Sequence, residues 1–257
     1  MHNPIPDILV GTDPIVEWLI PDLLPHGTIV QYAGDPGVGK SFFAYNLAMS
    51  VATQTPFLGF VPSSVQPVLY CDVENSVPDR NKYLRQVWRG LCKPDLELVK
   101  ENFWTSHFEL GNNNWDEVLR SLVSAYNPAL VVIDTATPCF SIEDENNNSE
   151  ASKVIRKLRH IQSIGTNKPT FLVLRHAKTF MEHEGDRKAR GAQAWKGETD
   201  GTWFHVRNRG RPRQDGLWRT HIEVDKVRAF GLRETVHIQP QRINEGIKLI
   251  RVAEDTK

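Results

Sequence analysis

A glycine-rich run near the start of the chain has residue types and spacing suited to holding phosphate. It matches the pattern GxxxxGK[ST] in full and lies between an apolar segment and a second apolar segment with helical character. Glycines let successive backbone N–H groups point at phosphate oxygens, and a helix N-terminus adds its positive dipole end. In such a loop Lys40 reaches the β- and γ-phosphates, and the Ser41 hydroxyl binds Mg²⁺. The pattern predicts a nucleotide site formed by Gly34, Asp35, Pro36, Gly37, Val38, Gly39, Lys40, Ser41 and Phe42.

A second feature is an apolar run that ends in a carboxylate. Residues 130–133 are Leu-Val-Val-Ile, and Asp134 follows them directly. An acidic residue at the end of a strand is common, but beside a phosphate-binding loop it typically holds magnesium, often through water. We therefore expect Asp134 to be a magnesium residue together with Ser41.

A third feature offers a group that could activate water. The predicted strand 68–73 carries Asp72 and is followed by Glu74. Alternation places the two acids on one face, with Glu74 nearer the edge of the sheet where ligands bind. Hydrolysis needs a base within hydrogen-bond reach of the attacking water, and Glu74 is the candidate. The alternative is that Glu74 only caps the helix that begins near Ser76.

A histidine follows another predicted strand. The run 170–174 is apolar apart from its first residue, and Arg175 and His176 come next. A polar side chain at this point can contact the γ-phosphate and transmit its loss to the following loop. We expect His176 to be such a sensor, and an ordinary surface histidine is the alternative.

These residues must be positioned by alternating strands and helices, which predict an α/β fold with a mostly parallel sheet flanked by helices. The expected strands are Thr28–Ala33, Val68–Val73, Phe103–Thr105, Leu130–Ile133 and Thr170–Leu174, the last of them predicted to be the final parallel strand. The expected helices are Ser41–Thr53, one that begins near Ser76, Trp115–Tyr126 and Ala151–Ile164.

The pattern changes after Leu174 to short β-like segments separated by turns. The segments are Gly201–Arg207, Trp218–Val224, Val236–Ile238 and Gly246–Val252. We expect them to be antiparallel strands that extend the same sheet. The predicted organisation is one ATPase domain over residues 1–257, with an N-terminal segment at 1–27 and a basic β extension at 175–257.

Charge is balanced over the whole chain but not within this extension. The chain has 31 Lys and Arg against 31 Asp and Glu, whereas residues 175–233 have 14 basic against 8 acidic residues. Nucleic-acid contact is one interpretation of such a segment, and a solvated charged surface is the other. The predicted contacts are Lys178, Arg187, Lys188, Arg190, Arg207 and Arg209.

Cysteine use and hydropathy exclude several classes of protein. The three cysteines form no CxxC pair, which argues against a disulfide framework or a structural zinc site. The first residues do not resemble a signal peptide, and no apolar run approaches the roughly 20 residues that span a bilayer. We expect a cytoplasmic protein with no membrane partner.

Together these motifs resemble the RecA-like ATPases of the RepA type, which are small hexameric replicative helicases, and the related single-domain AAA ATPases. The resemblance covers most of the chain. Its motifs are residues 18–25 (WLIPDLLP), GDPGVGKS at 34–41, the strand before Glu74, VVID at 131–134, DEN at 144–146, the strand before His176, and Arg190-Gly191. The chain departs from the pattern at Arg175, where many relatives have another histidine.

The resemblance implies a RecA-like core, ATP and Mg²⁺ as ligands, and a homo-oligomer, usually a hexameric ring, with ATP between subunits. It also implies that a neighbour's basic residues complete each site. Asp225-Lys226-Val227-Arg228 resembles the Lys-x-Arg element of such proteins, so Arg228 is the candidate arginine finger with Lys226 as its companion, and Arg219 is the alternative.

Three functions are compatible with these residues. The first is a DNA helicase or translocase that couples ATP turnover to single-stranded nucleic acid in replication. The second is a regulatory or recombination-type ATPase that switches assembly on DNA or a protein partner. The third is a binding module with a decayed site, against which the intact Lys40, Ser41, Glu74 and Asp134 argue.

Overall fold

The computed structural model describes residues 15–106, 114–178, 188–189, 193–208, 212–228, 231–243 and 245–254. Its strands are β1 (Trp18–Ile20), β2 (Leu24–Pro25), β3 (Ile29–Gly34), β4 (Val68–Asp72), β5 (Phe103–Ser106), β6 (Leu130–Asp134), β7 (Thr170–Lys178), β8 (Lys188–Ala189), β9 (Gly201–Arg207), β10 (Thr220–Val227), β11 (Val236–Ile243) and β12 (Gly246–Val252). Its helices are α2 (Lys40–Thr53), α3 (Val77–Gly90), α4 (Leu96–Asn102), α5 (Trp115–Tyr126), α6 (Ala136–Cys139), α7 (Asn148–Ile164) and α8 (Gln193–Glu198).

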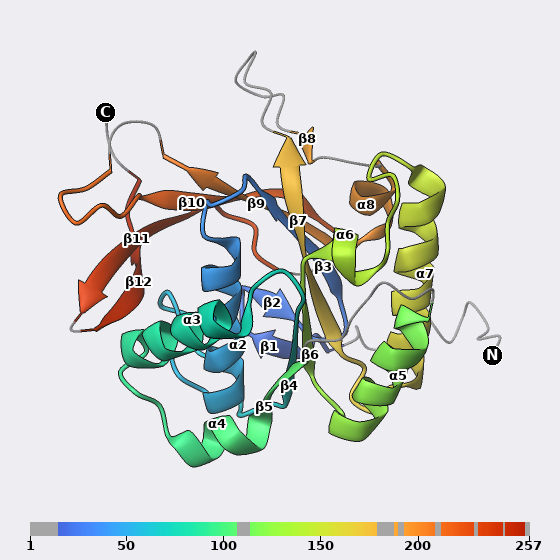
Figure 1. Cartoon of the computed structure of the whole chain (residues 1–257), viewed down its shortest axis with the longest axis horizontal. Coiled ribbons are helices and arrows are strands. Elements are labelled where there is room, and N and C mark those ends of the chain that lie inside the picture. The colour runs from blue at the N-terminus through green and yellow to red at the C-terminus, as the bar shows by residue number, and fades with distance from the viewer. Residues whose placement is uncertain are drawn as a thin grey trace.

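The main sheet runs in the order β12-β11-β10-β9-β3-β7-β6-β4-β5, with β8 paired to β7. Helices α2, α3 and α4 lie on one side of the central strands, and α5, α6 and α7 lie on the other (Figure 1). Strands β1 and β2 form a separate antiparallel pair. The α/β class predicted from the alternation of strands and helices is confirmed.

Two hydrophobic cores lie on the two faces of this sheet because successive strand residues point to opposite sides. In β6, Leu130 and Val132 join the core that surrounds α2. Val131 and Ile133 join the core under α5 and α7. Both faces of each central strand are therefore apolar, as expected for parallel strands covered by helices on both sides.

One prediction about the C-terminal strands is wrong. Strand β9 is antiparallel to β10, as expected, but it pairs in parallel with β3 on its other side, with Val30 opposite Gly201 and Gly34 opposite His205. The segment Thr170–Leu174 is therefore not in the last parallel strand of the chain. Helix α8 lies between β7 and β9 and belongs to the crossover that a parallel pair requires. With only six residues, α8 is too short to give a recognisable helical period. Strands β10, β11 and β12 are antiparallel, as predicted.

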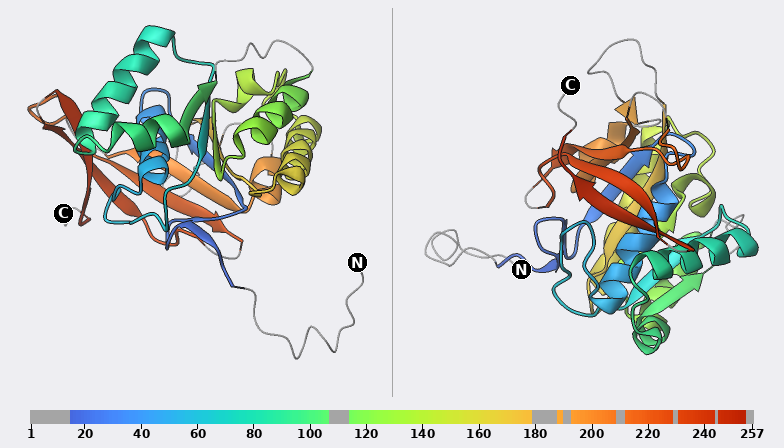
Figure 2. Two further views of the ribbon diagram at one scale, coloured as in Figure 1. Left: turned by 90° about the horizontal axis from the view of Figure 1, so that it is seen from below. Right: turned by 90° about the vertical axis from the view of Figure 1, so that its left-hand side faces the viewer.

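The antiparallel strands continue the sheet beyond β9, and in the left view of Figure 2 β11 and β12 lie beside α3, at the end of the sheet away from α7. Ile222, Ile238 and Leu249 from these strands pack in the same core as α2. The outermost strand, β12, meets the end of α3 at Gly90, where an added Cβ would stand 2.0 Å from the Ile247 carbonyl oxygen. The absent side chain at Gly90 therefore allows α3 to cover part of the sheet edge.

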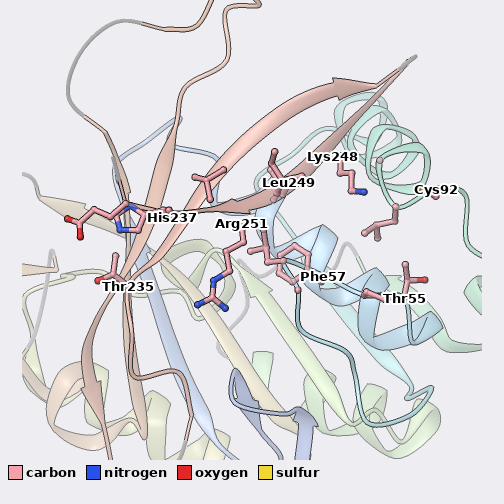
Figure 3. Close-up of a pocket in the computed structure, with 17 residues that line it drawn as sticks. Thr55, Phe57, Cys92, Thr235, His237, Lys248, Leu249 and Arg251 are labelled. Carbon is pink, nitrogen blue, oxygen red and sulfur yellow. The ribbon is translucent and has the colours of Figure 1, made fainter. Parts of the chain in front are cut away.

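A cavity of about 1050 Å³ lies beside the uncovered part of β12 (Figure 3). Phe57, Leu91 and Leu249 contribute apolar surface, and Lys248 and Arg251 contribute basic groups. None of the site residues predicted from the sequence lines it. In the described part of the chain, no helix is long and apolar enough to span a membrane.

Candidate nucleotide site

The glycine-rich loop joins β3 to α2, the arrangement that its sequence pattern predicts. Gly39 has a φ of 106°, a conformation that L side chains rarely adopt, and it directly precedes the first turn of α2. At Gly34 an added Cβ would stand 2.6 Å from the His205 carbonyl oxygen of β9. Glycine at 39 lets the loop turn directly into α2, and glycine at 34 lets the end of β3 lie close to the backbone of β9.

Lys40 points back into this loop. The side chain is only 7% exposed, and Nζ donates to the carbonyl oxygens of Gly34 at 2.9 Å and Asp35 at 3.0 Å. Burial lowers the pKa of Lys40, and the carboxylates of Asp134 and Glu74 oppose that shift. Both predicted acids are therefore close enough to act on the lysine charge.

Asp134 ends β6 and is fully buried. Its Oδ2 accepts a hydrogen bond from the Tyr70 hydroxyl at 2.7 Å, whereas Oδ1 has no hydrogen-bond partner among the described residues. Burial raises the pKa of Asp134 to about 7, Asp72 adds to the shift, and Tyr70 and Ser41 oppose it. A buried carboxylate oxygen without a donor is costly, and a bound cation would satisfy it. The site therefore fits magnesium.

Glu74 and His176 face each other at the ends of β4 and β7. Glu74 Oε1 lies 3.8 Å from His176 Nε2, and the two side chains are 47% and 26% exposed. Both line a cavity of about 420 Å³ together with Lys40 and Ser41 of the loop. Three separate stretches of sequence thus meet at one cavity, large enough for a nucleotide's phosphates.

The alternation argument for Asp72 and Glu74 is wrong. Strand β4 ends at Asp72, which is fully buried and accepts hydrogen bonds from Tyr45 and Asn75, so alternation does not extend to Glu74. The cap of α3 is Ser76, whose Oγ accepts from the Asp79 N–H. Glu74 is therefore not the residue that caps this helix, and its side chain reaches the cavity instead.

Strand β9 and the segment that leads from it to β10 supply residues that sequence reasoning did not place here. The Arg207 guanidinium donates to the Gly37 carbonyl oxygen at 2.8 Å and lies over the Trp218 ring, 5.0 Å from its centroid. Both side chains line the same cavity. Arg207 was predicted to contact nucleic acid. Its described side-chain contacts are to Gly37 of the phosphate-binding loop and to Trp218, both in its own chain.

Buried His205 supports the loop from beneath. Nδ1 bonds the Tyr32 hydroxyl at 2.6 Å, and Nε2 bonds the Thr220 hydroxyl at 2.8 Å. Burial lowers the pKa of His205 to about 3, and the charge of Lys40 adds to that shift. A neutral, fully bonded ring therefore lies next to Gly34. The sequence could not predict that His205 packs next to the loop, because a single histidine in a β-like segment has no distinctive pattern.

Lys226 and Arg228 lie at the opposite edge of the sheet from the glycine-rich loop. Lys226 pairs with Thr202 near the start of β9, whereas the loop follows the end of β3. Lys226 Nζ donates to the carbonyl oxygens of Lys196, Gly197 and Thr199, and Arg228 donates to the Gly197 carbonyl oxygen at 2.9 Å. Thr202 is three residues, or about 10 Å, before His205, the partner of Gly34 at the start of the loop, and Arg228 lies beyond Lys226 in the direction away from it.

Arg219, the alternative arginine finger, lies at the edge of the sheet where the glycine-rich loop is. It directly precedes Thr220, which pairs with Arg207 at the edge where the loop lies, and its Nε donates to Gln239 Oε1 at 3.0 Å. The two candidate arginine fingers therefore lie at opposite ends of β10.

The remaining predicted nucleic-acid residues are only partly described. The backbone of Lys178, the last residue of the strand that carries His176, pairs with that of Lys188 in β8. Arg187, Arg190 and Arg209 lie outside the described residues.

The chain is similar to a known protein family and to a solved structure. The family model AAA_25, described as an AAA domain, matches residues 5–179. Among solved structures, the chain is similar to a KaiC-like protein from the hyperthermophilic archaeon Pyrococcus horikoshii OT3, with 17% identity, a TM-score of 0.54, and coverage of 90% of this chain and 93% of that chain. This likeness confirms the RecA-like α/β fold. No curated protein matches the chain.

Proposed function

The chain belongs to the AAA_25 family and is a RecA-like phosphate-loop ATPase, and we propose that it couples ATP turnover to single-stranded nucleic acid as a RepA-type helicase or translocase. In this proposal the protein assembles as a homo-oligomeric ring, hexameric as in the RepA type, with ATP between neighbouring subunits. The same site would also serve a switch that assembles on DNA or a protein partner, which is the alternative.

The observation that carries the proposal is the meeting of Lys40, Glu74 and His176 at one cavity beside the unpartnered oxygen of Asp134. The loop N–H groups and Lys40 would hold the phosphates, and Ser41 and Asp134 would hold Mg²⁺. When bound, Mg²⁺ supplies positive charge that offsets the charge on the phosphate oxygens during transfer.

Glu74 is suited to orient and deprotonate the attacking water. Its side chain is half exposed at the cavity, and no N-cap bond holds its carboxylate in α3. His176 lies within 4 Å of it and would contact the terminal phosphate. Because β7 leads from His176 into the segment that contains Lys178, a change at the phosphate could reach the basic residues that follow.

The positions of Lys226 and Arg228 support a ring. Lys226 lies about 10 Å along the strands from the start of its own loop, and Arg228 lies farther away. Both lie at the opposite edge of the sheet, so in this proposal they are placed to act on a neighbour's nucleotide. About half of the Arg228 side chain is exposed, although it also bonds Gly197. An arginine supplied across an interface stabilises charge in the transition state and accelerates phosphoryl transfer by about 10³ to 10⁵.

The test is steady-state ATP turnover with and without single-stranded DNA or RNA, on wild type and Glu74→Gln. Stimulation of wild type that Glu74→Gln lacks supports a nucleic-acid-coupled ATPase, and strand-separation assays would then distinguish a helicase from a switch. Turnover that ignores both nucleic acids would contradict the coupling and favour a switch on a protein partner. Glu97→Gln is the matched control, because it makes the same change at an exposed glutamate of α4 that pairs only with Lys100 among the described residues.

A further inference from the structure

Two buried tyrosines lie directly behind the magnesium residues. Tyr45 is in α2, one helical turn after Ser41, and Tyr70 is in β4. Their rings stack with centroids 3.9 Å apart and planes 3° from parallel, and both residues are fully buried. The stack packs helix against sheet, so both hydroxyl groups are held in defined positions.

Each hydroxyl binds a different buried aspartate. Tyr70 donates to Asp134 Oδ2 at 2.7 Å, and Tyr45 donates to Asp72 Oδ2 at 2.5 Å. Asp72 and Asp134 are opposite each other in the pairing of β4 with β6. Two carboxylates therefore lie side by side in the interior, and the stacked tyrosines give each of them a donor.

The two aspartates differ in the hydrogen bonds that their carboxylates accept besides those from the tyrosines. Asp72 also accepts from the backbone and side chain of Asn75. Asp134 has Tyr70 on Oδ2 and no partner for buried Oδ1 among the described residues. Burial raises the pKa of Tyr70 well above its ordinary value, so the phenol stays a donor. The hydrogen bond fixes rotation of the Asp134 carboxylate and leaves Oδ1 as its open acceptor.

We propose that Tyr70 is a positioning residue for magnesium: it holds one oxygen of Asp134 so that the other is presented to the metal. The stacked Tyr45 holds Asp72 in the same way but does not serve the metal. This inference rests on the proposed function, because it takes Asp134 as a magnesium residue. Groups that orient a metal-binding side chain contribute to affinity, and their removal typically weakens it by about 10- to 100-fold.

The test compares Tyr70→Phe with Tyr45→Phe, each of which removes one phenol from the same stack. Binding of a fluorescent ADP analogue is measured against Mg²⁺ concentration, so turnover is not the readout. Tyr70→Phe should raise the half-saturating Mg²⁺ concentration by about tenfold while metal-free affinity for the analogue stays unchanged. Tyr45→Phe should leave the half-saturating concentration within about twofold of wild type, since Asp72 keeps Asn75. Thermal unfolding reports the packing loss in both variants.

Asp134→Asn separates this inference from the function on which it rests. A weakened Mg²⁺ response in Asp134→Asn with a normal response in Tyr70→Phe would overturn the role of Tyr70 and leave the magnesium site standing. Equal shifts in Tyr70→Phe and Tyr45→Phe would also overturn it, because loss of packing would then explain both. Wild-type binding that is indifferent to Mg²⁺ would overturn the magnesium site itself.

Discussion

Glu74 Oε1 lies 3.8 Å from His176 Nε2, across the mouth of the nucleotide cavity. Glu74 follows β4 and His176 lies near the end of β7, and these two strands are separated in the sheet by β6 and its terminal Asp134. A candidate base and a candidate phosphate sensor therefore flank the candidate magnesium residue. This order along one sheet edge motivates the first prediction.

Replacing Glu74 by Gln should stop hydrolysis without stopping binding. The amide keeps the size of the side chain but cannot accept the proton of the attacking water, so kcat should fall by about 10² to 10⁴. Nucleotide affinity, measured with a fluorescent analogue, should change by less than about threefold. Glu97→Gln on the exposed face of α4 is the control. Equal loss of affinity and turnover would show that Glu74 is not a base.

Replacing Arg228 by Ala should lower turnover while leaving affinity for ATP largely intact. If Arg228 acts on a neighbour's nucleotide, kcat should fall by about 10³ or more. Mixing Arg228→Ala with Lys40→Ala should then restore part of the activity, because mixed interfaces pair an intact loop with an intact arginine. Arg219→Ala, tested in the same way, decides between the two arginines at opposite ends of β10. Mixtures as inactive as their components would contradict a role in trans for the residue tested.

The local parts of the site could be predicted from sequence because they are continuous in it. The loop from Gly34 to Ser41 needs only a preceding strand and a following helix, and the structure has β3 and α2 there. Asp134 could be placed at a strand end for the same reason. Apolar runs in strands covered on both faces, together with helical periods such as that of α5, also gave the right class of fold.

What could not be predicted depends on contacts distant in sequence. The parallel pairing of β9 with β3 follows from the path of the chain between β7 and β9, of which the structure describes only residues 188–189 and 193–200. The bond from Tyr70 to Asp134 joins residues 64 positions apart. Arg207 has the same charge whether it contacts a phosphate or the Gly37 carbonyl oxygen. Residue type alone cannot distinguish these environments.

Adding a methyl group at Gly90 should destabilise the fold. Its Cβ would stand 2.0 Å from the Ile247 carbonyl oxygen, so α3 and the edge strand β12 would have to separate. We expect Gly90→Ala to lower the free energy of unfolding by about 1–3 kcal/mol, measured with urea. Gly197→Ala in α8 is the matched control, since nothing lies within 4 Å of its added Cβ. That change should be neutral or stabilising by up to about 1 kcal/mol. Similar effects at both positions would contradict the close contact.

His205 should make the fold sensitive to acid. Burial lowers its pKa to about 3 from the ordinary value of 6.5, so between these pH values the unfolded chain binds a proton that the folded chain excludes. The free energy of unfolding must then fall as pH falls below 6.5, by up to about 1.4 kcal/mol per pH unit from this group. His205→Gln removes the titrating ring, so the plot of unfolding free energy against pH should be flatter by about 1 kcal/mol per unit between pH 6 and 4. The slope is the appropriate readout because the substitution also changes the bonds to Tyr32 and Thr220 and so shifts stability at every pH. Parallel plots for wild type and His205→Gln would mean that the folded protein accepts the proton, and that the ring beneath the phosphate-binding loop is less isolated from water than its burial indicates.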